Sequence, residues 1–123
     1  MGIGDPFDIW SLVGSGIDTF DCVSPTRLAR HGAALIKSHK GKINIKNSEY
    51  KYKIEPIEKD CECSTCCNYS LSYIHHLLKS EELLGLSLIT GHNIYFMNSL
   101  MQYIRDSIKN DNFEEAQKKW YSD

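Results

Sequence analysis

The residues best suited to chemistry are four cysteines within seven positions, Cys61, Cys63, Cys66 and Cys67. Cysteines this close rarely form disulfides with one another without strain. Three thiolates at Cys-x-Cys-x2-Cys spacing and one imidazole would complete the tetrahedral coordination of a structural zinc ion, which leaves no position for water or substrate. His92 follows Cys66 after twenty-five residues. We therefore expect a zinc site formed by Cys61, Cys63, Cys66 and His92.

The alternative for this cluster is a set of free thiols that bind no metal. Cys67 directly follows Cys66, so we expect its side chain to point away from the other sulfurs. His75 and His76 are expected to serve in packing or at the surface rather than as ligands. A short cysteine knuckle with a distant fourth ligand would join two elements of a subdomain that has little hydrophobic core of its own.

A second candidate is Asp21, which closes the apolar segment 17–21. An acid at the C-terminal end of a parallel strand lies on the face where α/β barrels build their active sites. A carboxylate there can act as a nucleophile or as an acid and base. The alternative, which the spacing alone favours, is an acid that only caps the turn at Pro25 and Thr26. Asp18 is a weaker candidate, because a regular strand would place it on the opposite face from Asp21.

Two arginines follow in a loop that we expect over residues 24–32. Arg27 and Arg30 lie three positions apart, and guanidinium groups beside a reactive acid could hold the phosphates of a nucleic acid. Solvated surface charge is the alternative. The combination with Asp21 favours the nucleic-acid interpretation modestly.

The charge of the chain is strongly segregated. The 123 residues are 41% hydrophobic and 24% charged with a net charge of −2, which argues against wholesale disorder and against a generally basic nucleic-acid-binding chain. Residues 1–21 carry four acids and no base, residues 22–53 eight Lys or Arg and one acid, and residues 54–123 eleven acids and six bases. A polyanionic partner is therefore expected at the basic middle segment.

Neither membrane insertion nor export is expected. No stretch approaches the ~18 consecutive apolar residues of a membrane span. The first eight residues contain two acids and no Lys or Arg, unlike a secretory signal. We therefore expect a cytoplasmic protein whose five cysteines are reduced.

The N-terminal segment predicts part of an α/β fold. Residues 1–4 have the character of a strand end, and a helix would begin at Asp5 and Pro6 and stop by Gly16. Residues 17–23 then predict a strand. A strand, a helix and a second strand form the unit of a parallel sheet, which two strands cannot build alone.

The rest of the chain predicts small strands and then helices. Residues 41–53 alternate loosely between apolar and polar types, which predicts exposed strands rather than core. Apolar residues within 71–78 predict a helix that ends near Gly85. A stripe with steps of three and four over residues 94–108 predicts a second helix, and Asn112 would cap a third.

These motifs together resemble the tRNA-guanine transglycosylase family, the bacterial-type queuine tRNA-ribosyltransferases. The resemblance rests on the run GIDTFDCVSPTR at 16–27, the cysteine and histidine pattern, Tyr69-Ser70 with YIHHL at 73–77, and His92-Asn93. It extends over the whole chain, which corresponds to the C-terminal third of that family's protein.

The resemblance implies an α/β fold: the C-terminal part of a (β/α)8 (TIM) barrel with an inserted zinc-binding subdomain and C-terminal helices. Residues 1–35 would form the last βαβ part of the barrel, with the nucleophile and the tRNA-binding loop. Residues 36–95 would form the zinc-binding subdomain, and residues 96–123 the closing helices.

The resemblance also implies a reaction. The family exchanges guanine at the tRNA wobble position for a deazaguanine precursor of queuosine, through a covalent intermediate between an aspartate and the ribose. Asp21 matches that nucleophile, and Met1 with Gly2 matches the base pocket. Arg27 and Arg30 match the loop that grips the anticodon loop.

The implied cofactor is Zn2+, because all four candidate ligands match the family's zinc ligands. The implied partners are the tRNA anticodon loop, a purine or deazaguanine base, and an N-terminal portion of the enzyme if it is separately encoded. The resemblance also implies a homodimer or heterodimer. It implies no association with a membrane.

Two departures from the family pattern leave alternatives open. Ser24 stands where the family usually has a large apolar residue. The family's second essential aspartate and most of its base-reading residues lie upstream of the matched region, so we expect a split or truncated gene or a shortened chain. The alternatives to an enzyme part are a non-catalytic zinc module that binds RNA or a partner subunit, and an inactive gene fragment.

Overall fold

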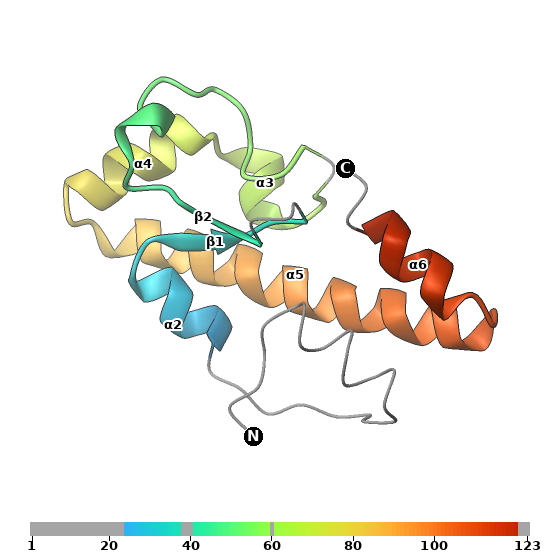
Figure 1. The fold of residues 1–123 in the computed structure, drawn as a ribbon. Coiled ribbons are helices and arrows are strands. Elements are labelled where there is room, and N and C mark those ends of the chain that lie inside the picture. The colour runs from blue at the N-terminus through green and yellow to red at the C-terminus, as the bar shows by residue number, and fades with distance from the viewer. Residues whose placement is uncertain (1–23, 38–40, 60, 121–123) are drawn as a thin grey trace.

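The computed structural model describes residues 24–37, 41–59 and 61–120 (Figure 1). The helix and strand expected between residues 5 and 23 lie outside this range, as do Met1, Gly2 and Asp21. The described elements are, in order, α2 (Ser24–Arg30), β1 (Ala33–Leu35), β2 (Lys42–Asn44), the 3-10 turn η1 (Ser48–Tyr50), α3 (Ser64–Asn68), α4 (Leu71–Lys79), α5 (Leu83–Lys109) and α6 (Phe113–Trp120).

Helix α5 is the central element, and the other helices and β1 pack against it. Figure 1 shows β1, β2 and α2 beside its N-terminal half and α6 beside its C-terminal end. The prediction that a helix ends near Gly85 was wrong. The preceding helix α4 ends at Lys79, and Glu81 turns the chain with a left-handed φ of 57°. Gly85 is instead a buried position inside α5.

The segment that we expected to be a loop at residues 24–32 forms helix α2. Pro25 suits the first turn of a helix because its fixed φ is already helical. Ala29 is completely buried and Leu28 packs against the core, so tertiary contacts stabilise this short helix. The helix ends at Arg30, and the chain then turns through Gly32, whose φ of +81° favours glycine.

The sheet of the described residues has two antiparallel strands, with Ala34 opposite Ile43. Strand β1 is buried along its length, whereas β2 is mostly exposed. Exposed strands were expected over residues 41–53, and this holds for β2, although Ile45 just after it is completely buried. The described residues are mostly helical and contain no parallel strand pair, so they do not show the barrel itself.

Two hydrophobic clusters form the core of the described residues. The first joins α2, α3, α4, the strands and the start of α5, and its completely buried members are Ala29, Ala34, Ile45, Ile74 and Ile89. The second joins β1, the middle of α5 and α6, with Leu35, Phe96, Leu100, Ile104, Ala116 and Trp120. The helix predicted after Asn112 is confirmed as α6, which Trp120 anchors edge-to-face against Phe96 at 5.6 Å.

The proposed division of the chain into three parts remains a prediction. Its boundary between residues 95 and 96 lies inside the continuous helix α5. Among the described residues, every helix is too short or too polar to traverse a lipid bilayer.

Candidate metal centre

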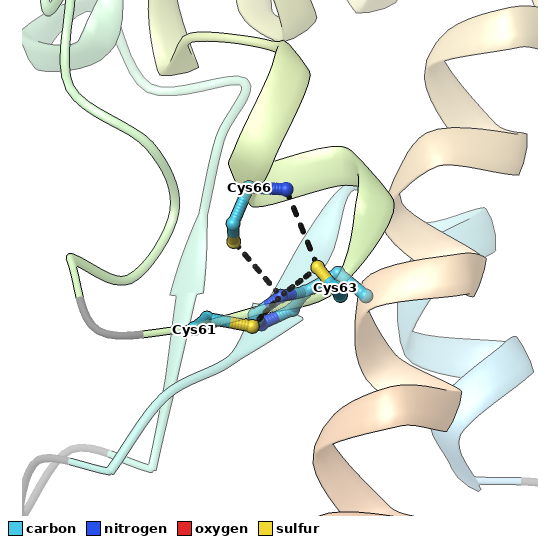
Figure 2. A group of neighbouring side chains, drawn as sticks. Cys61, Cys63 and Cys66 are labelled. Carbon is cyan, nitrogen blue, oxygen red and sulfur yellow. Dashed lines mark hydrogen bonds between the residues drawn. The ribbon is translucent and has the colours of Figure 1, made fainter.

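The structure brings Cys61, Cys63, Cys66 and His92 together. Their ligand atoms all lie within 4.8 Å of one another. Nδ1 of His92 lies 3.6 Å from Sγ of Cys61, 3.5 Å from Sγ of Cys63 and 3.3 Å from Sγ of Cys66. Figure 2 shows the three sulfur atoms pointing toward one another from the loop and the first turn of α3.

These distances fit a tetrahedral metal ion. Zinc binds thiolate at about 2.3 Å and imidazole at about 2.0–2.1 Å, so the tetrahedral angle separates sulfur from nitrogen by about 3.6 Å. The observed separations of 3.3 to 3.6 Å nearly match this value. Four soft or borderline donors in this arrangement can hold a metal ion without any further ligand.

Local structure positions the three sulfurs. Cys63 is the N-cap of α3, and its sulfur accepts a hydrogen bond from the backbone N–H of Cys66 at 3.3 Å. The spacing of three residues at the helix start places both sulfurs on one side. The hydroxyl of Thr65 donates to the carbonyl of Leu88 at 2.7 Å, which ties α3 to α5.

The second ring nitrogen of His92 fixes how the ring is used. Nε2 lies 2.8 Å from the carbonyl oxygen of Leu35, a group that can only accept. The ring must therefore carry its proton on Nε2, which leaves the lone pair of Nδ1 directed at the three sulfurs. A carboxylate oxygen of Glu58 lies 3.9 Å from Nε2.

Burial sets the protonation of the site in the absence of a metal. Desolvation raises the pKa of the Cys61 thiol to about 11 and also raises the pKa of Cys66. Desolvation lowers the pKa of His92. The metal-free pocket therefore favours neutral thiols and a neutral imidazole, and a divalent cation would have to displace the thiol protons when it binds.

The site is largely closed to solvent, and only Cys61 among its four residues is partly exposed. Cys63 and Cys66 are 4% and 8% exposed, and His92 is completely buried. Four protein ligands in a closed pocket are typical of a structural metal site, whereas a catalytic site keeps an open position. A metal ion bound by these four residues would cross-link α3 and the preceding loop to α5.

The sequence correctly suggested the location of Cys67, His75 and His76. Cys67 is exposed and lies outside the group. His75 is buried in packing, with Nδ1 at 2.8 Å from the carbonyl oxygen of Ile45, and His76 is exposed.

The two candidate phosphate-binding arginines lie apart from the metal group, on α2. Arg27 and Arg30 are both exposed, and residues three apart on a helix share a face. Helix α2 turns its buried Ala29 toward the core, so the arginines face outward. The location of the described arginines is therefore compatible with contacts to a polyanion.

The role of Asn93 was not predicted from the sequence, where this residue stood out only as part of a motif. Asn93 is completely buried beside His92 on α5. Its side-chain oxygen accepts from the N–H of Leu35 at 2.9 Å, and its amide nitrogen donates to the carbonyl of Ala33 at 3.1 Å. The available signal was an amide directly after a candidate ligand and just before an apolar stripe.

The similarity to known proteins extends over the whole length of the chain. The sequence model of the family described as queuine tRNA-ribosyltransferase matches residues 1–123. The chain belongs to the queuine tRNA-ribosyltransferase family. Within this family, the chain is 54% identical over 115 residues to the Queuine tRNA-ribosyltransferase of Thermosipho africanus. The aligned region covers 94% of this chain and 31% of the relative.

Two further members of the queuine tRNA-ribosyltransferase family show the same extent of similarity. The Queuine tRNA-ribosyltransferase of Fusobacterium nucleatum is 47% identical over 120 residues, 98% of this chain and 32% of the relative. That of Lachnoclostridium phytofermentans is 47% identical over 119 residues, 97% of this chain and 31% of the relative. The chain therefore spans about a third of the length of the relatives that it matches.

Proposed function

We propose that this chain forms the C-terminal, metal-bearing part of a tRNA-guanine transglycosylase. The observation that carries the proposal is the coincidence of two findings. The family match extends over residues 1–123, and the four side chains that the sequence singled out as metal ligands converge in the structure. A closed site of this kind is a demanding arrangement that unrelated thiols rarely produce.

The proposed reaction is exchange of guanine at the tRNA wobble position for a queuosine precursor base. The carboxylate of Asp21 attacks the anomeric carbon of the ribose, the bond to guanine breaks, and guanine leaves with the bonding electrons and takes up a proton. The ring nitrogen of the incoming base then loses its proton and displaces the aspartate from the same carbon, which releases the Asp21 carboxylate. Two inversions retain the configuration, and Met1 and Gly2 would line the pocket of the base.

We propose Zn2+ as the metal at the candidate centre. Three thiolates and one imidazole suit zinc, and the ion would supply cross-linking between elements rather than chemistry on substrate. Cys61, Cys63 and Cys66 would hold it from the knuckle, and His92 would hold it from α5. The ion would thereby substitute for hydrophobic core in the surrounding segment.

The tRNA anticodon loop is the proposed partner of α2. Arg27 and Arg30 are exposed on one helix, and guanidinium groups bind phosphate oxygens in a bidentate manner. The segment from residue 22 to 53 has eight basic residues and one acid, which favours attraction of a polyanion. A target base that is flipped out of the anticodon loop would be consistent with this mode of tRNA binding.

A complete active site would need more of the barrel than this chain supplies. The chain spans about a third of its relatives, and a water-excluding pocket needs walls on all sides. We therefore propose that the remaining part of the enzyme comes from an N-terminal partner chain or a longer form, in a homodimer or heterodimer. A tRNA substrate also favours the cytoplasm as the location.

The experiment that tests the RNA assignment is tRNA binding measured at several salt concentrations. Arg27→Ala and Arg30→Ala should each reduce the slope of log affinity against log salt by about one for each phosphate group that the variant no longer binds. Arg105→Ala is the matched control, because Arg105 is equally exposed but lies on α5. Binding that is indifferent to salt and to both α2 substitutions would contradict the assignment.

A further inference from the structure

The backbone N–H and carbonyl groups along the two edges of strand β1 bind different kinds of partner. One edge pairs with β2, and the flanking bonds run from Ile45 N–H to the carbonyl of Gly32 at 2.9 Å and from Ile36 N–H to the carbonyl of Gly41 at 3.1 Å. The other edge faces α5. There Asn93 and His92, rather than another strand, bind the backbone groups of Ala33 and Leu35.

The Asn93 side chain binds this edge as a neighbouring strand would. It accepts from the N–H of Leu35 at 2.9 Å and donates to the carbonyl of Ala33 at 3.1 Å. A carboxamide is suited to this because it carries a donor and an acceptor side by side. Asn93 is completely buried, and Ala33 and Leu35 are 8% and 4% exposed, so water cannot readily replace these bonds.

The same strand edge is connected to the metal centre through His92. One ring nitrogen of His92 faces the three cysteine sulfurs at 3.3 to 3.6 Å, and the other binds the carbonyl of Leu35 at 2.8 Å. His92 and Asn93 are consecutive on α5, so an ion that fixes the histidine also fixes the backbone that carries Asn93. The ring and the carboxamide together hold β1.

Helix α2 follows the position of β1. Only His31 and Gly32 separate Arg30 from β1, and α2 packs on both β1 and α5. The N–H groups of His31 and Gly32 bind the carbonyls of Leu28 and Ala29 at 3.0 and 2.9 Å, which makes the connection tight. A displacement of β1 would therefore be passed to the helix that carries the two arginines.

We propose that Asn93 is a positioning residue that, together with His92, couples occupancy of the metal centre to the placement of β1 and of the arginine-bearing helix α2. The part that concerns RNA rests on the proposed function. The part that concerns β1 stands on the hydrogen bonds alone. The coupling runs through elements in direct contact and needs no distant pathway.

Amide hydrogen exchange by NMR on the metal-loaded chain tests the β1 part. Asn93→Leu keeps the branching of the side chain but removes its donor and acceptor, so the Leu35 amide should exchange at least about tenfold faster, because local opening then exposes it. The Ile45 amide, which binds Gly32 on the opposite edge, should change much less. Asn98→Leu is the matched control, because Asn98 is exposed on the same helix, and it should leave both amides unchanged.

Metal content and chelation complete the test. The Asn93→Leu chain should still bind one ion, because Asn93 is not among the ligands. Removal of the metal from the unsubstituted chain should speed exchange at Leu35 at least as much as the substitution does, because the metal also supplies folding free energy to the surrounding segment. Unchanged exchange at Leu35 in either comparison, or equal acceleration at both amides in the Asn93→Leu chain, would overturn the proposal. An unchanged Leu35 amide after chelation would overturn it even if Asn93→Leu fails to fold.

Affinity for tRNA tests the RNA part separately. Asn93→Leu should weaken binding about fivefold, the lower end of typical coupling between sites. Unaltered affinity together with faster exchange at Leu35 would overturn the link to α2 and leave the hold on β1. Failure of the unsubstituted chain to bind tRNA would instead count against the proposed function, and the exchange result at Leu35 would be unaffected.

Discussion

At the residue scale, the two ring nitrogens of His92 contact different groups. Nδ1 faces the sulfurs, and Nε2 donates to the carbonyl of Leu35 at 2.8 Å. Such a bond fixes the tautomer and the ring orientation of a metal-binding histidine. The four candidate ligands could be predicted from the sequence because their residue types and spacing are themselves the signal. The partners of the ring could not, since Leu35 is fifty-seven positions away.

Loss of one ligand should release the metal and unfold the surrounding segment. Cys63→Ala removes a ligand and the N-cap acceptor of α3, so we expect less than one ion per chain and lost structure over about residues 55–95, because the metal supplies folding free energy there. Cys67→Ala is the matched control, since Cys67 is an exposed neighbour outside the group. Elemental analysis and circular dichroism measure both effects. A Cys63→Ala chain that stays folded and retains its ion would contradict the assignment.

Metal affinity should rise steeply with pH. Burial raises the pKa of Cys61 to about 11 and raises that of Cys66, so binding at neutral pH displaces protons from the thiols. The pKa of His92 is lowered, so this ring is neutral at pH 7 and opposes binding only in acid. A log affinity that increases by about two to three per pH unit between pH 6 and 8 is expected from chelator competition. An affinity independent of pH would contradict thiolate ligation.

At the scale of elements, the packing of the helices explains which boundaries the sequence could and could not predict. The stripe over residues 94–108 has the helical period and lies in α5. The predicted start of that helix lies too far along the chain, because glycine typically follows the end of a helix and Gly85 therefore suggested a boundary. In the folded chain Gly85 marks a close approach of α4 to α5 instead, and α2 is a helix because Ala29 packs against its neighbours.

The two glycines of α5 should respond oppositely to alanine. A Cβ at Gly91 would lie no closer than 3.8 Å to Thr65 Oγ1, so Gly91→Ala should raise the free energy of unfolding by about 0.5–1 kcal/mol through reduced backbone entropy of the unfolded chain. A Cβ at Gly85 would lie 3.1 Å from Leu77 Cβ and 3.4 Å from the backbone nitrogen of Leu78. Overpacking there should outweigh the gain and lower stability by about 1 kcal/mol.

Urea unfolding of the metal-loaded chain measures this pair. Both substitutions change the same residue type in the same helix, so helix propensity cancels from the comparison. An equal stabilisation by both alanines would show that α4 and α5 do not approach closely at Gly85.

At the scale of the whole molecule, the chain holds all four candidate metal ligands within about a third of the length of its relatives. The family could be predicted from the sequence, because the motif run at 16–27 and the ligand pattern occur together. The barrel remains a prediction that rests on the family resemblance. The described strands form only the β1–β2 pair.

The isolated chain should show no detectable guanine exchange. A nucleophile accelerates a reaction only when a surrounding pocket holds it against its target and excludes water. This chain spans about a third of its relatives, so most of that pocket would be missing. The chain should nonetheless bind its metal, because the four ligands all lie within it.

The most direct test of the proposed function is incorporation of labelled guanine into tRNA, with this chain alone and with a separately produced N-terminal portion of the enzyme. We predict no incorporation by the chain alone and restored incorporation in the mixture, which Asp21→Asn in this chain should abolish without loss of the metal. Arg105→Ala in the same mixture should retain activity. Incorporation by the chain alone, by the Asp21→Asn mixture, or by neither preparation of the unsubstituted chain would contradict the proposal.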